Sequence, residues 1–529
     1  MIHQKRRKKV RILCIADGGA VEKIKAILSC YQNFLSTRDD ITIDILPQDG
    51  SAAETTVYDR IVIDEHHFAQ AAQIYADEHG CRDIYLWLFG TMIELKHPVM
   101  LDEVQKRYLH ARNWEGVKHI NKIKIEINRV LRNVILDTYP SQLQLESTSY
   151  CNARCIMCSH YYASNKGALD MDERMLGRLE ELLPYLEVII MHGNGEPLIS
   201  KMFDTCVETY ASYGIRMATN TNLSVLSDRQ IDYINAAFAN IRVSCDACTK
   251  VIYEGIRRGL SFEVLEENLA RLRDRCPSVT KTMATVLMRQ NLMQLSDLVH
   301  FAAKYGFEEI IFSNLGTSLI VGNENDSVIH YPHLASRQLR RALEQGKRDN
   351  IKVTMPTGFD LTLDDENVCE KELLQLNETP FFRSDSEIQD IREFAQSVIG
   401  DEYRLIEDLK DCYWDNDLFR CEGICEWCIE KPYIDLKGNV FVCCINATYR
   451  VGNLFDYDSF LDLWNNEVYK KIRTLFYQGK LPGFCDNCQF ILNGSLQRLK
   501  VDDPGEDFYR RRRISKFYYD YCEEHGNER

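Results

Sequence analysis

The run Cys-Asn-Ala-Arg-Cys-Ile-Met-Cys at residues 151–158 places three cysteines close together, with the spacing Cys-x3-Cys-x2-Cys. An iron–sulfur cube normally takes four thiolates. Three thiolates packed this tightly can bind one side of a cube and leave one iron free of protein. An open coordination position is typical of a catalytic metal, whereas a structural site is closed. The spacing therefore predicts a metal centre with an open position.

Composition limits the class of protein. The chain has 529 residues, of which 45% are hydrophobic and 27% are charged, enough for roughly two to four globular domains. The formal net charge of −15 argues against a general nucleic-acid surface. The basic start at 5–11 is followed by too short an apolar stretch for a signal peptide. No run approaches the roughly 18 apolar residues of a membrane span. We expect a soluble cytoplasmic protein.

The cysteines are numerous and clustered. The chain has 20 of them, and most of the short gaps fall at 151–158, 421–428, 443–444 and 485–488. Disulfides are rare in the cytosol. Short gaps between cysteines in such a protein favour metal binding over a disulfide framework.

Residues 9–90 alternate between strand-like and helix-like segments. Short apolar runs predict strands at 10–16, 41–46, 60–64 and 83–89, with helical spacing between them at 21–34 and 68–79. This pattern predicts an N-terminal parallel α/β, Rossmann-like domain over 1–95. The turn at 17–19 contains two glycines but is not a Gly-x-Gly-x-x-Gly loop, so a plain β–α turn is favoured over nucleotide binding.

The β–α rhythm resumes at residue 141. It predicts a partial (β/α)6 barrel over 141–320, whose strand candidates are 142–145, 188–191, 215–218, 241–244, 281–287 and 309–312. In such a barrel the loops at the C-terminal strand ends carry the site. The cysteines at 151–158 follow the first strand, so we expect them at that functional end.

Four further parts complete the predicted α/β organisation. Residues 96–140 look helical and connect the two α/β domains, and residues 321–420 form an acidic bridging segment. A small cysteine-rich domain follows at 421–495, and a charged tail at 496–529.

Polar groups follow the other barrel strands. Met-His-Gly-Asn-Gly-Glu-Pro-Leu at 191–198 follows the second strand, and Thr-Asn-Thr-Asn at 219–222 follows the third. Ser-Cys-Asp at 244–246 follows the fourth, and an Arg-x-Gly stretch lies within 256–262. A glycine pair lets backbone approach a ligand closely. Because parallel strands end at one edge, we expect these groups to converge beside the cysteines.

These motifs resemble those of a known family. Over 141–320 the chain is similar to the radical S-adenosylmethionine (radical SAM) enzymes, in the cysteine loop, the Gly-Asn-Gly-Glu-Pro-Leu segment, and the Ser-x-Asp and Arg-x-Gly stretches. In that family SAM binds the open iron of a [4Fe–4S] cluster. Reduction of the cluster yields methionine and a 5′-deoxyadenosyl radical, which abstracts a hydrogen atom from the substrate.

The resemblance implies a set of contacts. Cys151, Cys155 and Cys158 would bind the cluster, and Gly195 and Glu196 would hold the SAM amino group. The other residues expected around SAM are Met157, near the adenine, and Asn220, Ser244, Asp246 and Arg257. Strand ends are often polar because the chain is leaving the sheet, so a purely structural role stays open for the last three. A zinc site with His160 as fourth ligand is the alternative for the cysteine loop.

A second cysteine set lies at the C-terminal end and consists of Cys428, Cys443, Cys485 and Cys488. The Lys-Gly-Asn turn at 437–439 predicts a β-hairpin that brings the first two together. Four thiolates fit a closed [4Fe–4S] cluster or tetrahedral zinc equally well by geometry.

The resemblance favours a cluster at this second set. The segment is similar to the SPASM/twitch extension of many radical SAM enzymes, where an auxiliary cluster lies near the substrate. Full SPASM domains hold two auxiliary clusters and continue Cys-x2-Cys-x5-Cys-x3-Cys. Here no cysteine follows Cys488 before Cys522. This departure implies one auxiliary [4Fe–4S] cluster.

Five other cysteines keep open roles. Cys421 and Cys425 repeat the first spacing with Cys428, and they are either alternative ligands or buried thiols. Cys245, Cys248 and Cys444 are either hydrogen-atom donors or inert thiols, and inert thiols are the more common case.

The sequence thus predicts an enzyme with two [4Fe–4S] clusters, with the auxiliary cluster assisting an oxidation. Its need for low-potential electrons implies a flavodoxin or ferredoxin partner, and no catalytic acid or base can be named. Peptide-modifying members often begin with a winged-helix domain, and the α/β character of 1–95 therefore favours a small-molecule substrate, such as a sugar, a cyclitol or another metabolite. A maturase of ribosomally made peptides is the alternative, and a zinc- or cluster-bearing scaffold or sensor is the non-enzymatic one.

Overall fold

The computed structural model describes two compact units, Met1–Tyr139 and Pro140–Arg529. The described residues are 8–15, 39–45, 60–64, 83–88, 91–94, 99–163, 169–316, 321, 323–356, 358–378, 380–399, 407–409, 414, 419–421, 424–444, 449–485 and 496–498.

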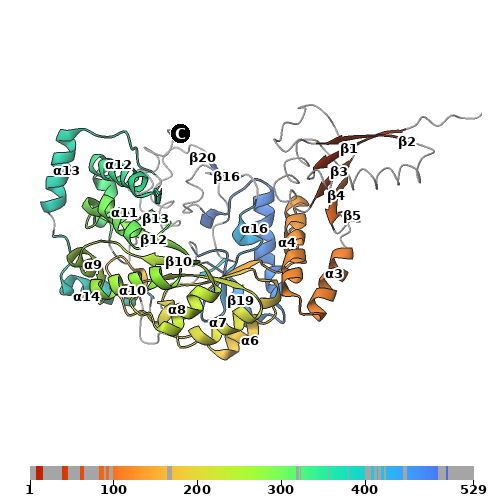
Figure 1. The fold of residues 1–529 in the computed structure, drawn as a ribbon, viewed down its shortest axis with the longest axis horizontal. Coiled ribbons are helices and arrows are strands. Elements are labelled where there is room, and N and C mark those ends of the chain that lie inside the picture. The colour runs from red at the N-terminus through yellow and green to blue at the C-terminus, as the bar shows by residue number, and fades with distance from the viewer. Residues whose placement is uncertain are drawn as a thin grey trace, which may run out of the picture. The chain divides into compact units, whose positions relative to one another are not determined.

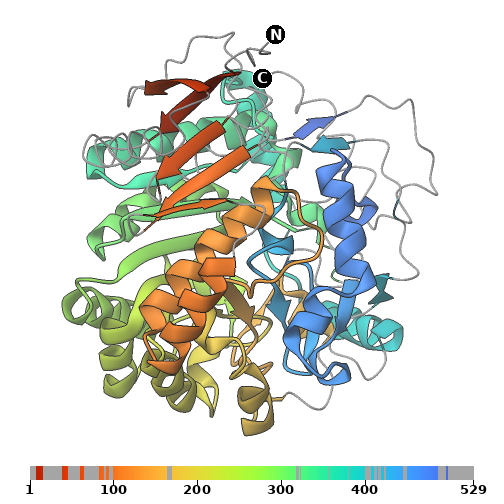
Figure 2. The same ribbon diagram turned by 90° about the vertical axis from the view of Figure 1, so that its right-hand side faces the viewer.

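The N-terminal unit contains a five-stranded sheet of order β2-β1-β3-β4-β5. Its strands are β1 (Lys8–Ile15), β2 (Asp39–Ile45), β3 (Arg60–Asp64), β4 (Asp83–Leu88) and β5 (Thr91–Glu94). The first four are parallel to their neighbours and β5 is antiparallel to β4 (Figures 1 and 2). All four predicted strands are present, which confirms a parallel α/β domain. The helices predicted at 21–34 and 68–79, and the turn at 17–19, lie outside the described residues.

Two helices complete this unit, α3 (Val99–His110) and α4 (Trp114–Val130). Asn113 ends the turn between them and caps α4 by accepting a hydrogen bond from the Gly116 backbone N–H. The buried ammonium of Lys124 lies 2.7 Å from an Asp102 carboxylate oxygen and 3.0 Å from one of Asp137. One cation therefore joins α3, α4 and the loop that follows them.

The C-terminal unit is built on an eleven-stranded sheet of order β14-β13-β12-β10-β9-β8-β6-β17-β18-β19-β15. Its barrel strands are β6 (Gln142–Leu145), β8 (Val188–Met191), β9 (Arg216–Thr221), β10 (Phe238–Ser244), β12 (Thr280–Leu287) and β13 (Glu309–Asn314). All six are parallel, which confirms the predicted partial (β/α)6 barrel. A further parallel strand, β14 (Lys352–Thr354), joins the edge beside β13 and was not predicted.

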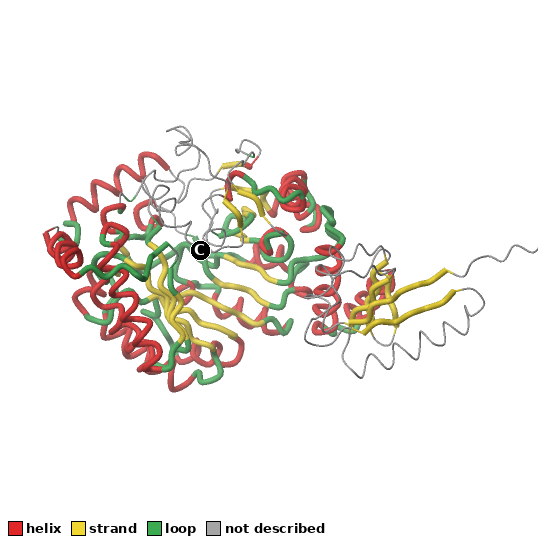
Figure 3. Tube along the Cα trace, turned by 90° about the horizontal axis from the view of Figure 1, so that it is seen from above, coloured by secondary structure: helices red, strands yellow, loops and turns green. Residues whose placement is uncertain are grey.

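Helices cover the outer face of this curved sheet (Figures 1 and 3). They are α6 (Glu173–Leu179), α7 (Phe203–Ser212), α8 (Asp228–Ala237), α9 (Lys250–Ile256), α10 (Phe262–Arg275), α11 (Leu295–Lys304) and α12 (Pro332–Asp349). Side chains alternate along each strand. In β10, Ile241 and Val243 are fully buried on the helix side, whereas Arg242 and Ser244 lie half-buried on the concave side.

The remaining elements are short or lie toward the C-terminus. They are β7 (Arg154–Cys155), α5 (Ser159–Ala163), β11 (Arg257–Arg258), α13 (Glu366–Glu378), α14 (Asp385–Ile399), β15 (Glu407–Asp408), β16 (Phe419–Cys421), β17 (Tyr433–Ile434), β18 (Asn439–Phe441), β19 (Tyr449–Asn453), α15 (Phe460–Trp464), α16 (Glu467–Tyr477) and β20 (Leu496–Arg498). No helix in the described part of the chain is long and apolar enough to cross a membrane.

The cysteine-rich segment continues the barrel sheet. Strand β17 pairs in parallel with β6, and β18 folds back on β17 as the predicted hairpin. Asp435 forms the turn, because its Oδ1 accepts hydrogen bonds from the backbone N–H groups of Lys437 and Asn439. Gly438 has φ +78°, a left-handed conformation that favours glycine. The hairpin is confirmed, and its pairing with the first barrel strand is an additional finding.

The buried side of the barrel strands sets the stability of this unit. We expect Ile241→Ala to lower the free energy of unfolding by about 3 kcal/mol, because Ile241 is fully buried and the truncation leaves a cavity. The matched control is Val251→Ala, whose side chain is 74% exposed on α9 and should change stability by less than about 0.5 kcal/mol. Anaerobic thermal melts followed by circular dichroism measure both, and equal midpoints for the two variants would contradict the assigned core.

Candidate active site

The first cysteine set lies in the loop after β6, at the C-terminal edge of the barrel. Cys155 is buried in β7, Cys158 is half-buried and Cys151 is exposed. The three thiols lie close enough to interact electrostatically. Burial raises the pKa of Cys155 to about 12, and desolvation by the surrounding protein raises that of the more exposed Cys151 to about 11. Without metal these two thiols hold their protons, and a bound iron cluster is the kind of partner that displaces them.

A short antiparallel pair holds the cysteine loop in place. Strand β7 pairs with β11, and Cys155 stands opposite Arg257. The Ile156 backbone N–H adds a hydrogen bond of 3.0 Å to the carbonyl of Ile256. Gly259, in the predicted Arg-x-Gly stretch, has φ +87°, and a Cβ there would lie 3.2 Å from the Asn152 carbonyl oxygen. The Arg-x-Gly stretch therefore supports the cluster loop directly.

Arg257 and Asp246 form a buried ion pair beside the cysteines. The Arg257 Nη2 lies 2.7 Å from Asp246 Oδ2, and its Nη1 lies 3.8 Å from the Cys155 sulfur. Asp246 also accepts a hydrogen bond from the Val286 backbone N–H at 2.8 Å. Both predicted SAM contacts are thus brought to the site. Asp246 is fully buried, and it contacts Arg257 and β12.

Gly195 brings the second strand end against the cysteine loop. A Cβ at this position would lie 2.2 Å from the Thr148 carbonyl oxygen and 2.6 Å from that of Tyr150. The next backbone N–H, of Glu196, donates to the same Tyr150 oxygen at 2.8 Å. Only glycine allows this approach without moving backbone.

The Glu196 carboxylate is used within the protein. It accepts hydrogen bonds from the Thr221 hydroxyl and the Asn222 N–H, each at 2.6 Å, and from the Leu198 N–H at 3.2 Å. These hydrogen bonds therefore connect the loop after β8 to the end of β9. Because the Glu196 carboxylate is already occupied, contacts of this segment with SAM would be made mainly by its backbone groups.

Met157 lies on an apolar wall of the site. It packs, half-buried, against a buried group of Ile156, Ile256, Met288 and Leu315. Phe382, from the segment between α13 and α14, packs against the same group. These side chains come from the cysteine loop, α9, and the ends of β12 and β13, and they suit the flat apolar face of an adenine.

Two of the residues predicted to contact SAM have polar side chains without a hydrogen bond to another described residue. The side chains of Asn220 and Ser244 are half-buried on the concave face, and within the described residues neither makes a side-chain hydrogen bond. His160, proposed as a zinc ligand, instead contacts the Ser149 carbonyl oxygen with its Nε2 at 2.8 Å. In the part of the chain that the structure describes, no three Cys, His, Asp or Glu side chains are close enough to hold a single metal ion.

The second cysteine set converges next to the β17–β18 hairpin. Cys428, Cys443 and Cys485 are all buried. Cys428 interacts electrostatically with Cys485, and both Cys428 and Cys443 act on the hydroxyl of Tyr469. The structure therefore brings three of the four predicted ligands together. Cys488 lies outside the described residues.

A further thiol stands beside this set. Cys425 is half-buried, and its thiol is hydrogen-bonded to that of Cys428. The backbone N–H of Cys428 also donates to the Cys425 carbonyl at 3.0 Å. Cys421 lies in β16, opposite Leu496 of β20. Of the two alternative ligands that the sequence left open, Cys425 is the one that the structure places against the set.

A buried arginine beside Cys428 was not predicted from the sequence. Arg473 of α16 is fully buried, and its Nε donates to the Cys428 carbonyl at 2.9 Å. Its guanidinium lies over the ring of Trp464 at 4.7 Å. The sequence signal that could have revealed it is the helical spacing of α16, which places one arginine on the buried side. Helical spacing alone, however, does not show that a charged residue is buried.

The three thiols considered as hydrogen-atom donors are buried or half-buried, and two of them contact a protein oxygen. Cys245 is fully buried, its sulfur lies 3.2 Å from the Ala247 carbonyl oxygen, and burial raises its pKa to about 12. Cys248 is half-buried, with its sulfur 3.7 Å from Gln294 Oε1. Cys444 is half-buried beside Cys443.

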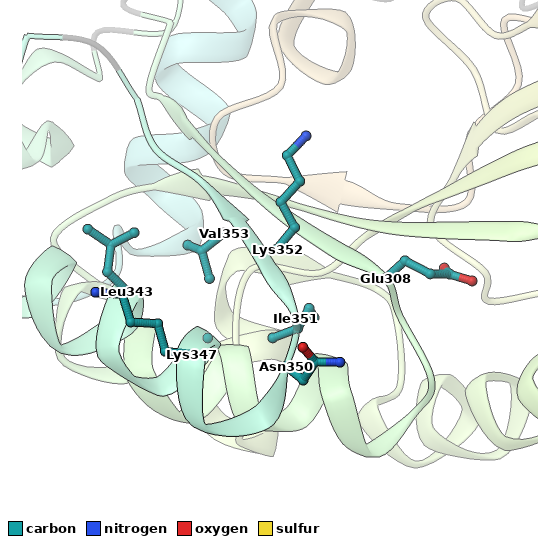
Figure 4. A pocket seen from close by; sticks show the side chains of 8 residues that line it. Glu308, Leu343, Lys347, Asn350, Ile351, Lys352 and Val353 are labelled. Atoms are coloured by element: carbon teal, nitrogen blue, oxygen red, sulfur yellow. The ribbon is translucent and has the colours of Figure 1, made fainter.

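One surface pocket lies away from this edge. Figure 4 shows it where the chain enters β13 and β14, at the N-terminal ends of these strands. Its lining residues are Glu308, Leu343, Gly346, Lys347, Asn350, Ile351, Lys352 and Val353. They come from α12 and the strand starts, so the pocket is separate from the cysteine loop.

The close approach at Gly195 gives a direct test of the site. We expect Gly195→Ala to reduce the iron bound by the first set and to weaken SAM binding by about tenfold or more, because the new Cβ collides with backbone rather than with a flexible side chain. Iron analysis and calorimetric titration of SAM measure the two effects. Gly177→Ala is the control, because nothing lies within 4 Å of a Cβ there. Wild-type iron and SAM binding in Gly195→Ala would contradict this arrangement.

The second set is tested by removing single thiols. We expect Cys428→Ala to lower the iron content from about eight to about four atoms per chain, because one of two four-iron clusters is lost. Cys206→Ala, at a buried cysteine of α7 in neither set, should keep the full content. Cys425→Ala is measured in parallel, and an equal loss there would make Cys425 a ligand in place of Cys488. Full iron in Cys428→Ala would remove Cys428 from the ligand set.

Comparisons with known proteins agree with this geometry. Residues 145–302 match the family model of the radical SAM superfamily, and residues 425–489 match the SPASM model, described as an iron–sulfur cluster-binding domain. Among curated proteins, the chain is 26% identical over 185 residues to a tungsten-containing aldehyde ferredoxin oxidoreductase cofactor-modifying protein of Pyrococcus furiosus, covering 33% of this chain and 51% of that protein. It is 24% identical over 173 residues to the mycofactocin maturase MftC of Mycolicibacterium smegmatis, covering 32% and 43%.

The chain spans about half the length of the curated relatives it matches. Among solved structures, SuiB of Streptococcus suis matches with a TM-score of 0.44 and 15% identity, over 77% of this chain and 83% of that one. The family models cover the cysteine loop with most of the barrel, from the end of β6 to α11, and the hairpin with its buried thiols. Residues 145–302 therefore belong to the radical SAM superfamily, and residues 425–489 form a SPASM iron–sulfur domain that extends the same sheet.

Proposed function

We propose that this protein cleaves SAM reductively and uses the resulting 5′-deoxyadenosyl radical to take a hydrogen atom from a substrate. The observation that carries the proposal is the meeting of three thiols, the buried Arg257 and the Ser244 hydroxyl, which has no hydrogen-bond partner among the described residues, at one edge of the barrel. Membership in the superfamily implies an enzyme that uses SAM and a [4Fe–4S] cluster. When bound, such a cluster supplies the electron that cleaves SAM.

The protein's own residues would then bind and orient SAM. Arg257 holds a positive charge 3.8 Å from the Cys155 sulfur, and Asp246 fixes its direction. Ser244 offers a hydroxyl that can donate to the SAM carboxylate or ribose. Met157 and its apolar neighbours exclude water from the adenine side. Gly195 allows the backbone of its loop to reach the amino group.

The SPASM domain would supply an auxiliary cluster close to the barrel. Its hairpin pairs with β6, the strand that leads into the first cysteine loop. We propose one auxiliary [4Fe–4S] cluster, held by Cys428, Cys443, Cys485 and Cys488. It would take up an electron during substrate oxidation, and a flavodoxin or ferredoxin would supply electrons to the first cluster.

The favoured substrate is a small molecule, such as a sugar, a cyclitol or another metabolite. The support is the N-terminal unit, whose parallel α/β sheet differs from a winged-helix leader-binding domain. Peptide maturation is the second candidate, and one relative is named as a maturase. Transfer of deuterium from a labelled candidate substrate into 5′-deoxyadenosine distinguishes the two classes.

The reductive step has a direct assay. We expect anaerobically reconstituted protein with dithionite and SAM to form 5′-deoxyadenosine and methionine in equal amounts, detected by liquid chromatography and mass spectrometry. Cys151→Ala, Cys155→Ala and Cys158→Ala should each abolish the product, because each removes a cluster ligand. Cys206→Ala should retain it.

Two outcomes would favour the non-enzymatic alternatives. Colourless, iron-free protein after anaerobic purification would favour a zinc-bearing scaffold. An intact first cluster that forms no 5′-deoxyadenosine from SAM and dithionite would favour a cluster-bearing sensor.

A further inference from the structure

The concave face of the barrel carries a continuous row of polar side chains. Strand register places Arg242 of β10 beside Asn220 of β9 on one side and Thr282 of β12 on the other. Thr282 stands beside Glu309 of β13, and Glu309 stands beside Lys352 of β14. The row therefore crosses five neighbouring parallel strands, and Arg242 lies at its second position.

The guanidinium of Arg242 lies inside the curve of the sheet. It acts electrostatically on His192, which follows β8, and on Glu309 of β13. Strands β8 and β13 lie on opposite sides of β10, each two strands away. One cation can influence both only from the concave side. The burial of Ile241 and Val243 on the helix side agrees with this orientation.

Arg242 forms no ion pair with a described residue. Its Nε is shielded from water and has no hydrogen-bond partner there. The acid in its row, Glu309, is already engaged, with the Lys352 ammonium at 2.9 Å and the Thr354 hydroxyl as its partners. A guanidinium nitrogen that is shielded from water and has no hydrogen-bond partner is unfavourable. Its direct neighbours Asn220 and Thr282 are neutral, so neither of them neutralises its charge.

The surroundings on the β8 side add positive charge. Lys431, just before β17, acts on His192 together with Arg242. Burial, with these two cations, lowers the pKa of His192 to about 4, so the imidazole is neutral at pH 7. Two carboxylates also lie on this side: Glu426, 3.9 Å from the Lys431 ammonium, and the fully buried Glu146, which accepts a hydrogen bond from the Asn194 backbone N–H at 2.7 Å. Lys431 thus has a carboxylate within 4 Å, whereas Arg242 forms no ion pair with a described residue, and an anion is the ligand that its guanidinium favours.

We infer that Arg242 binds an anionic group of the substrate, either a carboxylate or a phosphate. A guanidinium forms paired hydrogen bonds with either group. Arg242 precedes Ser244 by two residues on the same face, which places it about 6.6 Å deeper in the barrel than the strand end. A substrate anchored there points its remaining atoms toward the edge that carries the cysteines. The inference rests on the proposed function, since it assigns the substrate class of that same site.

Small anions provide the test, because the substrate is not needed. The probes are inorganic phosphate and acetate, titrated into the anaerobically reconstituted full chain with SAM bound, with calorimetry and the thermal midpoint as readouts. We expect saturable binding of at least one anion to the wild type, and the tighter one distinguishes phosphate from carboxylate recognition. Arg242→Gln should weaken it by about tenfold or more, because a charge-assisted hydrogen bond is lost. Arg242→Lys should fall between the two, because it keeps the charge and loses the paired geometry.

A matched control and a folding control accompany the titration. Arg341→Gln removes an arginine from the exposed face of α12 and should leave anion affinity unchanged. The iron content per chain is the folding control, and it must equal that of the wild type in each variant. If Arg242→Gln folds poorly, Arg242→Lys still tests the inference.

Three results would overturn the inference. They are equal anion affinity in wild type and Arg242→Gln, no saturable binding of either anion to the wild type, and a loss of SAM affinity in Arg242→Gln as large as the loss of anion affinity. The last would assign Arg242 to the carboxylate of SAM itself. Failure of the proposed function is a separate result, namely that the wild type forms no 5′-deoxyadenosine from SAM and dithionite.

Discussion

The buried ion pair between Arg257 and Asp246 is the interaction on which the organisation of the site depends. Moving two charges out of water costs several kcal/mol per ion, and this cost is offset only where the surrounding structure fixes both partners. Here the Val286 N–H fixes Asp246, and the pairing of β11 with β7 fixes Arg257. The same pairing holds Cys155. The cysteine loop therefore cannot shift without separating a buried pair, and the ends of β10 and β12 form one rigid unit with it.

A second constraint is the continuity of the sheet from the barrel into the SPASM domain. Strand β6 pairs with β8 on one side and with β17 on the other, so its two edges connect the two cysteine sets. Hydrogen bonds from the backbone N–H groups of Gln142 and Gln144 to the carbonyls of Glu430 and Pro432 extend this contact. Paired strands lie about 4.8 Å apart. The second set is consequently fixed to the barrel by backbone pairing, and its position does not depend on side-chain packing alone.

The sequence predicts the long elements well and the short ones poorly. Buried parallel strands are nearly continuous apolar runs, so the six barrel strands were found within about three residues. The strands β14 and β17 have three and two residues, and their pairing is decided by what lies beside them. Prediction of the site residues from sequence is limited in the same way. Spacing predicted that the three cysteines and Gly195 lie at one edge of the barrel, and the structure brings them together there. A polar residue at a strand end looks the same in sequence whether it binds a ligand or another residue. Glu196 and Asp246 proved to be tied to the protein by internal partners, and Arg242 gave no local signal because its role depends on register across five strands.

The recognition of an anion inside the barrel is compatible with the acidic character of the whole chain. The formal net charge is −15, and at physiological ionic strength exposed charges are screened beyond about 8 Å. Arg242 is half-buried on the concave face, so its interactions are screened less than those of exposed charges. Lys431 lies 3.9 Å from Glu426 and Lys352 lies 2.9 Å from Glu309, whereas Arg242 forms no ion pair within the described residues. We therefore expect the Arg242 guanidinium, rather than the distant acidic surface, to determine which anionic group is retained. Affinity for the anion should accordingly depend on Arg242 far more than on the net charge.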